Sequence, residues 1–132
     1  SVVIFLTSLA FIVNTTFFFN KLTFNEGMIM ENIVAQMLTA TGKKLYFYFN
    51  YDKQNSANNM EIDFLIAKNK ITSKHNISPI EVKSGKNYTF SSLNKFKNKY
   101  KEYLSTSYVL HIEDLRVEDE IVFLPVYMTC LL

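Results

Sequence analysis

Two short segments of this 132-residue chain place charged residues in the middle of strand-like patterns. They are residues 61–68 (EIDFLIAK) and 78–84 (SPIEVKS). Each alternates apolar and polar residues with a period of two, so Ile62, Phe64 and Ile66 are expected on one face of the first strand. We expect the segments to pair as an antiparallel hairpin with a long polar connection. Because a charged group in a strand is costly to desolvate, the fold must place a cation, a donor or water beside it.

The polar faces of these two strands direct three charged side chains toward one space. Asp63 lies in the middle of the first strand, and Glu81 and Lys83 lie two residues apart on the second. If the strands pair, all three share one face of the sheet. Two neighbouring carboxylates repel each other unless a hard cation lies between them, and Mg²⁺ or Mn²⁺ prefers such oxygen ligands. The pattern therefore predicts a divalent metal site, with a structural ion pair between Lys83 and either carboxylate as the alternative.

The remaining apolar patterns predict two helices and three further strands in one α/β domain. Residues 26–41 have a helical apolar stripe that ends near Gly42, and residues 90–104 form an amphipathic, lysine-rich helix. Strands are predicted at residues 44–51, 108–112 and 121–126, with a polar loop at 52–59 and an acidic turn at 113–120. Glu31 lies at the edge of the first helix's apolar stripe. It is a candidate fourth member of the site, or simply an acidic residue that favours the helix dipole.

The first 25 residues and the lone cysteine bear on where the chain resides. Residues 1–19 contain no charge and approach the length of a membrane span. Polar residues 14–16 interrupt this run and no basic residue precedes it, so we expect residues 1–25 to pack on the core, with membrane insertion as the alternative. Cys130 cannot form an internal disulfide, which favours the reducing cytoplasm.

The net charge of +2 is too small to argue for nucleic-acid binding by itself. The lysine-rich helix and the residues before it concentrate positive charge locally. Lys86, Lys95 and Lys99 are candidate phosphate contacts, with Tyr88 and Phe90 as neighbours that could stack on bases. A solvated helix face is the alternative. His75 and His111 have no partner at metal-ligand spacing, so we assign them no role.

The order of the charged residues resembles a known group of enzymes. Glu31, then Glu61-Ile-Asp63, then Pro79-Ile-Glu81-Val-Lys83, on helix, strand and strand, resembles the PD-(D/E)xK nuclease superfamily, whose restriction-endonuclease-like core is an αβββαβ mixed sheet flanked by helices. Longer stretches resemble the C-terminal domain of bacterial AAA+-type ATPases, a nuclease-like domain of unknown function. These stretches are residues 27–38 (GMIMENIVAQML), 45–48 (LYFY), 61–66 (EIDFLI), 79–85 (PIEVKSG) and 124–128 (LPVYM).

This resemblance implies a domain organisation. The 132 residues would form one nuclease-like domain at the C-terminal end of a longer chain, with an ATPase domain upstream as its partner. No GxxxxGK[ST] motif is present, so no ATP site is expected on this chain. The oligomeric state does not follow from the sequence.

The resemblance also implies a role for each site residue. Asp63 and Glu81 would hold Mg²⁺ or Mn²⁺, with the backbone carbonyl of Val82 as a further ligand. Lys83 would orient or deprotonate the attacking water, or stabilise charge on the phosphoryl oxygens. Glu31 would complete the outer shell or a second metal site. The implied reaction is metal-dependent phosphodiester hydrolysis of DNA or RNA, and a catalytically silent interaction or nucleic-acid-binding module is the alternative.

Overall fold

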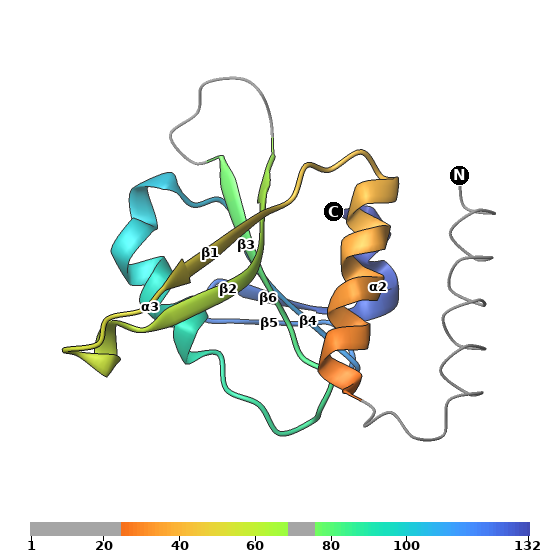
Figure 1. Cartoon of the computed structure of the whole chain (residues 1–132). Helices are drawn as coiled ribbons and strands as arrows, with labels where there is room; N and C mark the ends of the chain where they lie inside the picture. Colours follow the sequence, from red (N-terminus) through yellow and green to blue (C-terminus); the bar gives the residue numbers. More distant parts are fainter. Residues whose placement is uncertain (1–24, 69–75) are drawn as a thin grey trace.

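The protein is a mixed α/β domain built on one six-stranded sheet (Figure 1). The structure is a computed structural model that describes residues 25–68 and 76–132, so the predicted N-terminal segment through residue 24 and His75 lie outside it. The elements are α2 (Glu26–Ala40), β1 (Tyr46–Asn50), η1 (Ser56–Asn58), β2 (Met60–Ala67), β3 (Ile77–Val82), α3 (Ser91–Tyr100), η2 (Lys101–Tyr103), β4 (Ser107–His111), β5 (Arg116–Glu118), β6 (Ile121–Pro125) and η3 (Val126–Leu131). No described helix is both long enough and apolar enough to cross a bilayer.

The strand order in the sheet is β1-β2-β3-β4-β6-β5. The β1–β2, β2–β3 and β5–β6 pairs are antiparallel, whereas β3–β4 and β4–β6 are parallel. The succession α2, β1, β2, β3, α3, β4 agrees with the predicted order of helices and strands, and the predicted hairpin between β2 and β3 is present.

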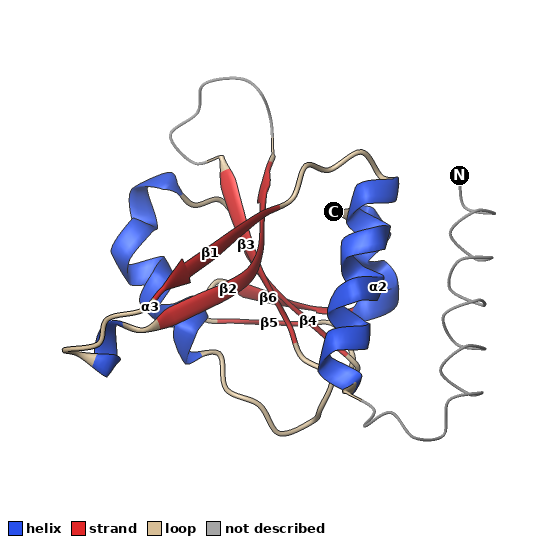
Figure 2. Ribbon diagram, viewed as in Figure 1, coloured by secondary structure: helices blue, strands red, loops and turns tan. Residues whose placement is uncertain are grey.

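Helices α2 and α3 lie on the two sides of the sheet (Figure 2) and divide the core into two clusters. Leu38 of α2 packs with Ile80 and Leu110, whereas Leu93 of α3 packs with Val109. Neighbouring residues of β4 thus face opposite helices, as expected for a strand that is covered on both faces.

Both helices begin and end for local reasons. The side chain of Asn25 caps α2 by accepting the Met28 N–H at 3.2 Å, and the helix ends just before Gly42, whose φ of +82° suits glycine. The predicted stop at Gly42 is therefore confirmed. In contrast, α3 begins at Ser91, and its N-cap residue Phe90 provides no side-chain hydrogen bond. The N–H groups of its first turn are left for other partners.

The acidic turn predicted at residues 113–120 is wrong in part, because β5 lies within it. This strand is short and exposed along its whole length, so it has no apolar alternation to reveal it. A two-residue turn joins β5 to β6, with φ of 49° at Asp119 and 62° at Glu120. Such turns favour Gly, Asn or Asp; Asp119 fits this preference, but Glu120 does not and no glycine marks the turn.

The β2 strand contains a bulge. Tyr46 pairs with Leu65, and Tyr48 pairs with Ile62. Phe47 therefore stands opposite two residues, Asp63 and Phe64. As a result, Ile62 packs in the α3 cluster while Phe64 and Ile66 pack in the α2 cluster. The prediction that these three apolar side chains share one face is wrong, because it assumed a regular ladder.

Candidate metal and active site

The candidate site lies where β2 and β3 stop pairing. The ladder between them ends at the Phe64–Ile80 pair, beside the bulge. Beyond this point the Asp63 side chain replaces a backbone partner, since its Oδ2 accepts the Val82 N–H at 2.7 Å. On the other side of β3, the Lys83 N–H donates to the Leu110 carbonyl at 2.8 Å. Bulges commonly redirect a side chain next to an active site, and this one accompanies the placement of Asp63.

Asp63, Glu81 and Lys83 line one cavity of about 190 Å³. The other residues around it are Glu61, Thr89, Ser91 and Ser92. The last two lie in the first turn of α3, which has no side-chain cap; its Leu93 N–H is directed to Glu81, and the Ser91 and Ser92 groups are left for an anion. The structure thus brings together the three charged side chains that the strand pattern placed on one face. It also includes Glu61, which period-two alternation places on the same face as Asp63, and the start of α3, which strand periodicity does not reveal.

Glu81 has the least favourable environment of these groups. Its side chain is 3% exposed, and Oε2 lies 2.9 Å from Nζ of Lys83. Besides this ion pair and the nearby Leu93 N–H, which also lowers its pKa, the carboxylate has no well-aligned hydrogen-bond donor among the described residues. Burial raises the pKa of Glu81, the Lys83 ammonium lowers it, and the nearby Asp63 raises it again. A buried carboxylate with unused hydrogen-bonding capacity is costly, and a cation would offset that cost.

The other two carboxylates also have shifted pKa values. Burial raises the pKa of Asp63, while the Val82 N–H and the Lys83 charge lower it. Glu31 is half-buried on α2, and burial and the charges of Asp63 and Glu61 raise its pKa. Glu31 is not among the residues that line the cavity. The structure therefore places it as a neighbour of the site, close enough to respond to its charge.

The three predicted phosphate-binding lysines have different surroundings. Lys86 is exposed in the loop between β3 and α3. Lys95 donates to the Asn59 carbonyl at 3.2 Å, so its ammonium has a protein partner. Lys99 is exposed, and its Nζ lies 5.2 Å from the ring centroid of Tyr100. Lys86 and Lys99 are the two that remain accessible to a ligand.

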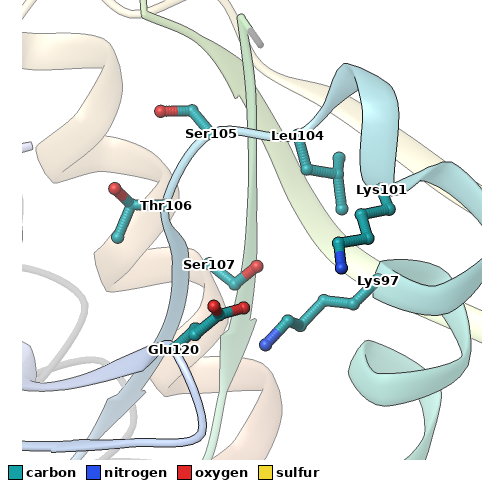
Figure 3. Close-up of a pocket in the computed structure, with 7 residues that line it drawn as sticks. All are labelled: Lys97, Lys101, Leu104, Ser105, Thr106, Ser107 and Glu120. Carbon is teal, nitrogen blue, oxygen red and sulfur yellow. The ribbon is translucent and has the colours of Figure 1, made fainter.

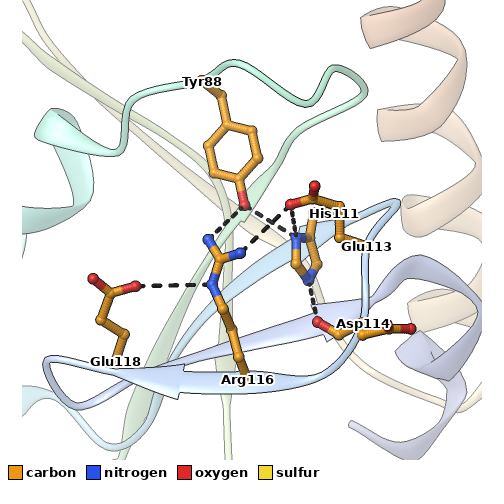
Figure 4. A network of polar contacts seen from close by, with 6 residues as sticks. All are labelled: Tyr88, His111, Glu113, Asp114, Arg116 and Glu118. Atoms are coloured by element: carbon orange, nitrogen blue, oxygen red, sulfur yellow. Dashed lines mark hydrogen bonds and ion pairs between the residues drawn. The ribbon is translucent and has the colours of Figure 1, made fainter.

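The two rings predicted to stack on bases pack against the protein instead. The Tyr88 hydroxyl lies 3.0 Å from Nδ1 of the buried His111 and accepts a hydrogen bond from Arg116 at 3.3 Å (Figure 4). Phe90 packs edge-on against Phe123, with ring centroids 5.4 Å apart. His111, to which the sequence assigned no role, therefore anchors the loop that leads from Lys83 to α3.

A larger cavity of about 500 Å³ lies near the other end of α3 (Figure 3). It is lined by Lys97, Lys101, Leu104, Ser105, Thr106, Ser107 and Glu120. Its two ammonium groups point toward the turn that contains Glu120, and Lys97 donates to the Asp119 carbonyl at 2.6 Å. None of the predicted catalytic residues lies there. Size alone does not identify the functional cavity.

We call the point beyond the Phe64–Ile80 pair, where β2 and β3 stop pairing, the β2–β3 fork. The ligand atoms at this fork are of the kind that a hard divalent cation prefers. They are the carboxylates of Asp63 and Glu81 and the backbone carbonyl of Val82, all of them oxygen ligands. The buried carboxylate of Glu81, whose ion pair with Lys83 leaves acceptor capacity unused, fits this set. Within residues 25–68 and 76–132, however, no group of three His, Cys, Asp or Glu side chains is placed to hold a metal ion. A cation here would depend on two carboxylates and on backbone or water.

Fold and site together define a mixed α/β domain with carboxylates and a lysine around a cavity at a sheet fork. Residues 26–130 match the family described as a domain of unknown function (DUF4143), and the chain belongs to that family. Comparisons with curated proteins and with solved structures give no match. The family description names no activity, so function has to be argued from the site itself.

Proposed function

We propose that this is a metal-dependent nuclease-like domain that hydrolyses phosphodiester bonds in DNA or RNA. The observation that supports this proposal is the cavity at the β2–β3 fork, where Asp63 and Lys83 surround the buried carboxylate of Glu81. Perturbed carboxylates beside a lysine in a cavity are typical of catalytic sites. The element order is consistent with the αβββαβ restriction-endonuclease-like core, which forms part of the proposal.

In the proposed hydrolysis, the site residues would have three roles: metal binding, donation to the reacting oxygens and phosphate binding. Asp63, Glu81 and the Val82 carbonyl would hold Mg²⁺ or Mn²⁺, which when bound polarises a phosphate and lowers the pKa of water. Lys83, whose side chain is 26% exposed, would donate to the attacking water or to a phosphoryl oxygen. The first turn of α3 lines the same cavity and offers N–H and hydroxyl donors to the phosphate.

We further propose, from the resemblance to AAA+-type ATPases, that the domain works beside an ATPase domain in the cytoplasm. Its Lys86 and Lys99 would contribute phosphate contacts outside the cavity, since both are exposed. Glu31, whose pKa responds to Asp63 and Glu61, would act from an outer position rather than as a direct ligand.

Cleavage of end-labelled DNA and RNA tests the proposal. With millimolar Mn²⁺ or Mg²⁺ the full chain should cut at least one substrate, and EDTA should abolish cutting. Asp63→Asn and Lys83→Met should each lower the rate by about 100-fold or more. Glu118→Gln, which removes an exposed carboxylate on β5, is the matched control and should cut at the wild-type rate. Cleavage that survives in Asp63→Asn would show that the activity belongs elsewhere.

A catalytically silent interaction module is the second candidate, and two observations favour it. Lys83 and Glu81 already form an ion pair. Among the described residues, no three His, Cys, Asp or Glu side chains lie close enough together to hold a metal ion. In that case the charged residues would support the fold alone. The wild-type chain would then cleave no substrate with any divalent cation, and Asp63→Asn would change stability only.

A further inference from the structure

The edge strand β1 exposes a row of aromatic side chains. Phe47, Phe49 and the following residue Tyr51 are 72%, 69% and 62% exposed, and we call these three the aromatic row. Tyr48 points the other way, since its ring packs against Phe96 of α3 with centroids 4.8 Å apart. The row thus lies on the face of β1 away from α3. Grouped, exposed rings of this kind usually mark an interaction surface.

The arrangement of two of these rings suits a flat partner. Phe49 and Tyr51 have ring planes only 5° apart and centroids 6.4 Å apart. Both side chains are exposed, so each ring presents a face on which a base can stack, and the parallel planes suit two successive bases.

Positive charge lies beside the row. Tyr51 lines a cavity of about 570 Å³ together with Lys53 and Lys99. Asp52 lines this cavity too. Its carboxylate accepts hydrogen bonds from the N–H groups of Gln54 and Asn55 and from the Asn58 side chain, so it stabilises the loop. Aromatic rings next to ammonium groups match the bases and phosphates of an unpaired strand.

The row also adjoins the candidate active site. Phe49 pairs across the ladder with Glu61, and Glu61 lines the cavity that holds Asp63, Glu81 and Lys83. Phe47 stands opposite Asp63 itself, at the bulge. A strand of nucleic acid that stacks on the row would therefore lie next to the segment of β2 that supplies Glu61 and Asp63 to the cavity.

We propose that the aromatic row, with Lys53 and Lys99, binds single-stranded nucleic acid, with bases stacked on the rings and phosphates at the lysines. This inference rests on the proposed function and specifies its substrate as an unpaired strand. A duplex cannot use the row, because its base faces are already covered by stacking within the helix. The other candidate occupants are a second copy of the chain and a protein strand added to the free edge of β1.

Fluorescence anisotropy of a labelled oligothymidylate, titrated with the full chain in EDTA, tests this proposal. The wild type should bind the oligomer and should bind a duplex of equal length more weakly. Phe49→Ala and Tyr51→Ala should each weaken binding by about 5- to 150-fold, whereas Phe49→Tyr should retain it. Tyr127→Ala is the matched control, since that ring is 72% exposed on η3, and it should bind as the wild type does. Circular dichroism should show that every variant is folded.

Equal binding by the wild type and Phe49→Ala, or tighter binding to the duplex, would overturn the proposal. So would a dimer seen by size-exclusion chromatography that Phe49→Ala dissociates, because a second copy would then cover the row. Because EDTA removes divalent cations, this binding assay does not depend on the proposed metal-dependent cleavage. Oligothymidylate binding without any cleavage would count against the nuclease function alone, and duplex cleavage without oligothymidylate binding would count against the aromatic row alone.

Discussion

Replacing Lys83 with methionine should destabilise the domain by about 2–4 kcal/mol near neutral pH. Nζ of Lys83 lies 2.9 Å from Oε2 of Glu81, and the two side chains are 26% and 3% exposed. At an effective dielectric constant of about 20, two unit charges at that separation attract by about 6 kcal/mol. Solvent access to Lys83 reduces this attraction, and methionine keeps much of the packing of the lysine stem.

The loss should depend on pH in a defined direction. Burial already raises the pKa of Glu81 above its ordinary value of 4.5, and removal of the ammonium raises that pKa further. A carboxyl group whose folded-state pKa is raised contributes stability below its unfolded pKa and loses it as pH rises through the folded pKa. The deficit of Lys83→Met should therefore be small at about pH 4 and complete above the folded-state pKa.

Urea denaturation in EDTA, followed by circular dichroism at both ends of this pH range, measures the effect. Lys86→Met is the matched control, because Lys86 is exposed, and it should change the free energy of unfolding by less than about 0.5 kcal/mol. The double variant Lys83→Met/Glu81→Gln should recover most of the loss, since it leaves no buried charge unpaired. A deficit that is independent of pH, or a double variant as unstable as the single one, would refute the reasoning.

Two further predictions concern β4 and the β5–β6 turn. The pKa of His111 is lowered by burial and by Arg116, so the stability that its neutral ring contributes is present above the unfolded value of 6.5 and lost as pH falls below it. Between about pH 7.5 and about pH 5.5, urea midpoints should fall more for the wild type than for His111→Gln, and equal slopes would contradict this. Glu120→Gly should stabilise the domain by up to about 1 kcal/mol, because φ is 62° at that position. If Glu120→Gly has a lower thermal midpoint than the wild type, then the positive φ at Glu120 does not strain the backbone.

The strands of the site could be predicted because their patterns are local. The alternation in residues 61–68 and 78–84 predicts two strands, and the polar connection between them predicts their antiparallel pairing. From there, the meeting of Asp63, Glu81 and Lys83 follows from strand geometry, and the structure places all three around one cavity. The roles of these residues in catalysis remain predictions.

Other features depend on contacts between distant parts of the chain. The bulge opposite Phe47 has no marker such as glycine, so regular alternation misplaced Ile62. The partner of Lys95 is a backbone carbonyl 36 residues away, which no helical wheel reveals. The sequence also does not predict the exposure of Phe47 and Phe49, because an aromatic strand pattern is typical of a strand that packs against the core. These side chains are exposed because β1 lies at the edge of the sheet.

Calorimetric titration of Mn²⁺ into the full chain near neutral pH tests the metal site most directly, because it needs no knowledge of the substrate. The wild type should bind Mn²⁺ saturably, Asp63→Asn and Glu81→Gln should abolish binding, and Lys83→Met should keep it, since Lys83 is a competitor for Glu81 rather than a ligand. An absence of binding at millimolar Mn²⁺, or binding that is unchanged in Glu81→Gln, would contradict the assignment of a metal to the β2–β3 fork.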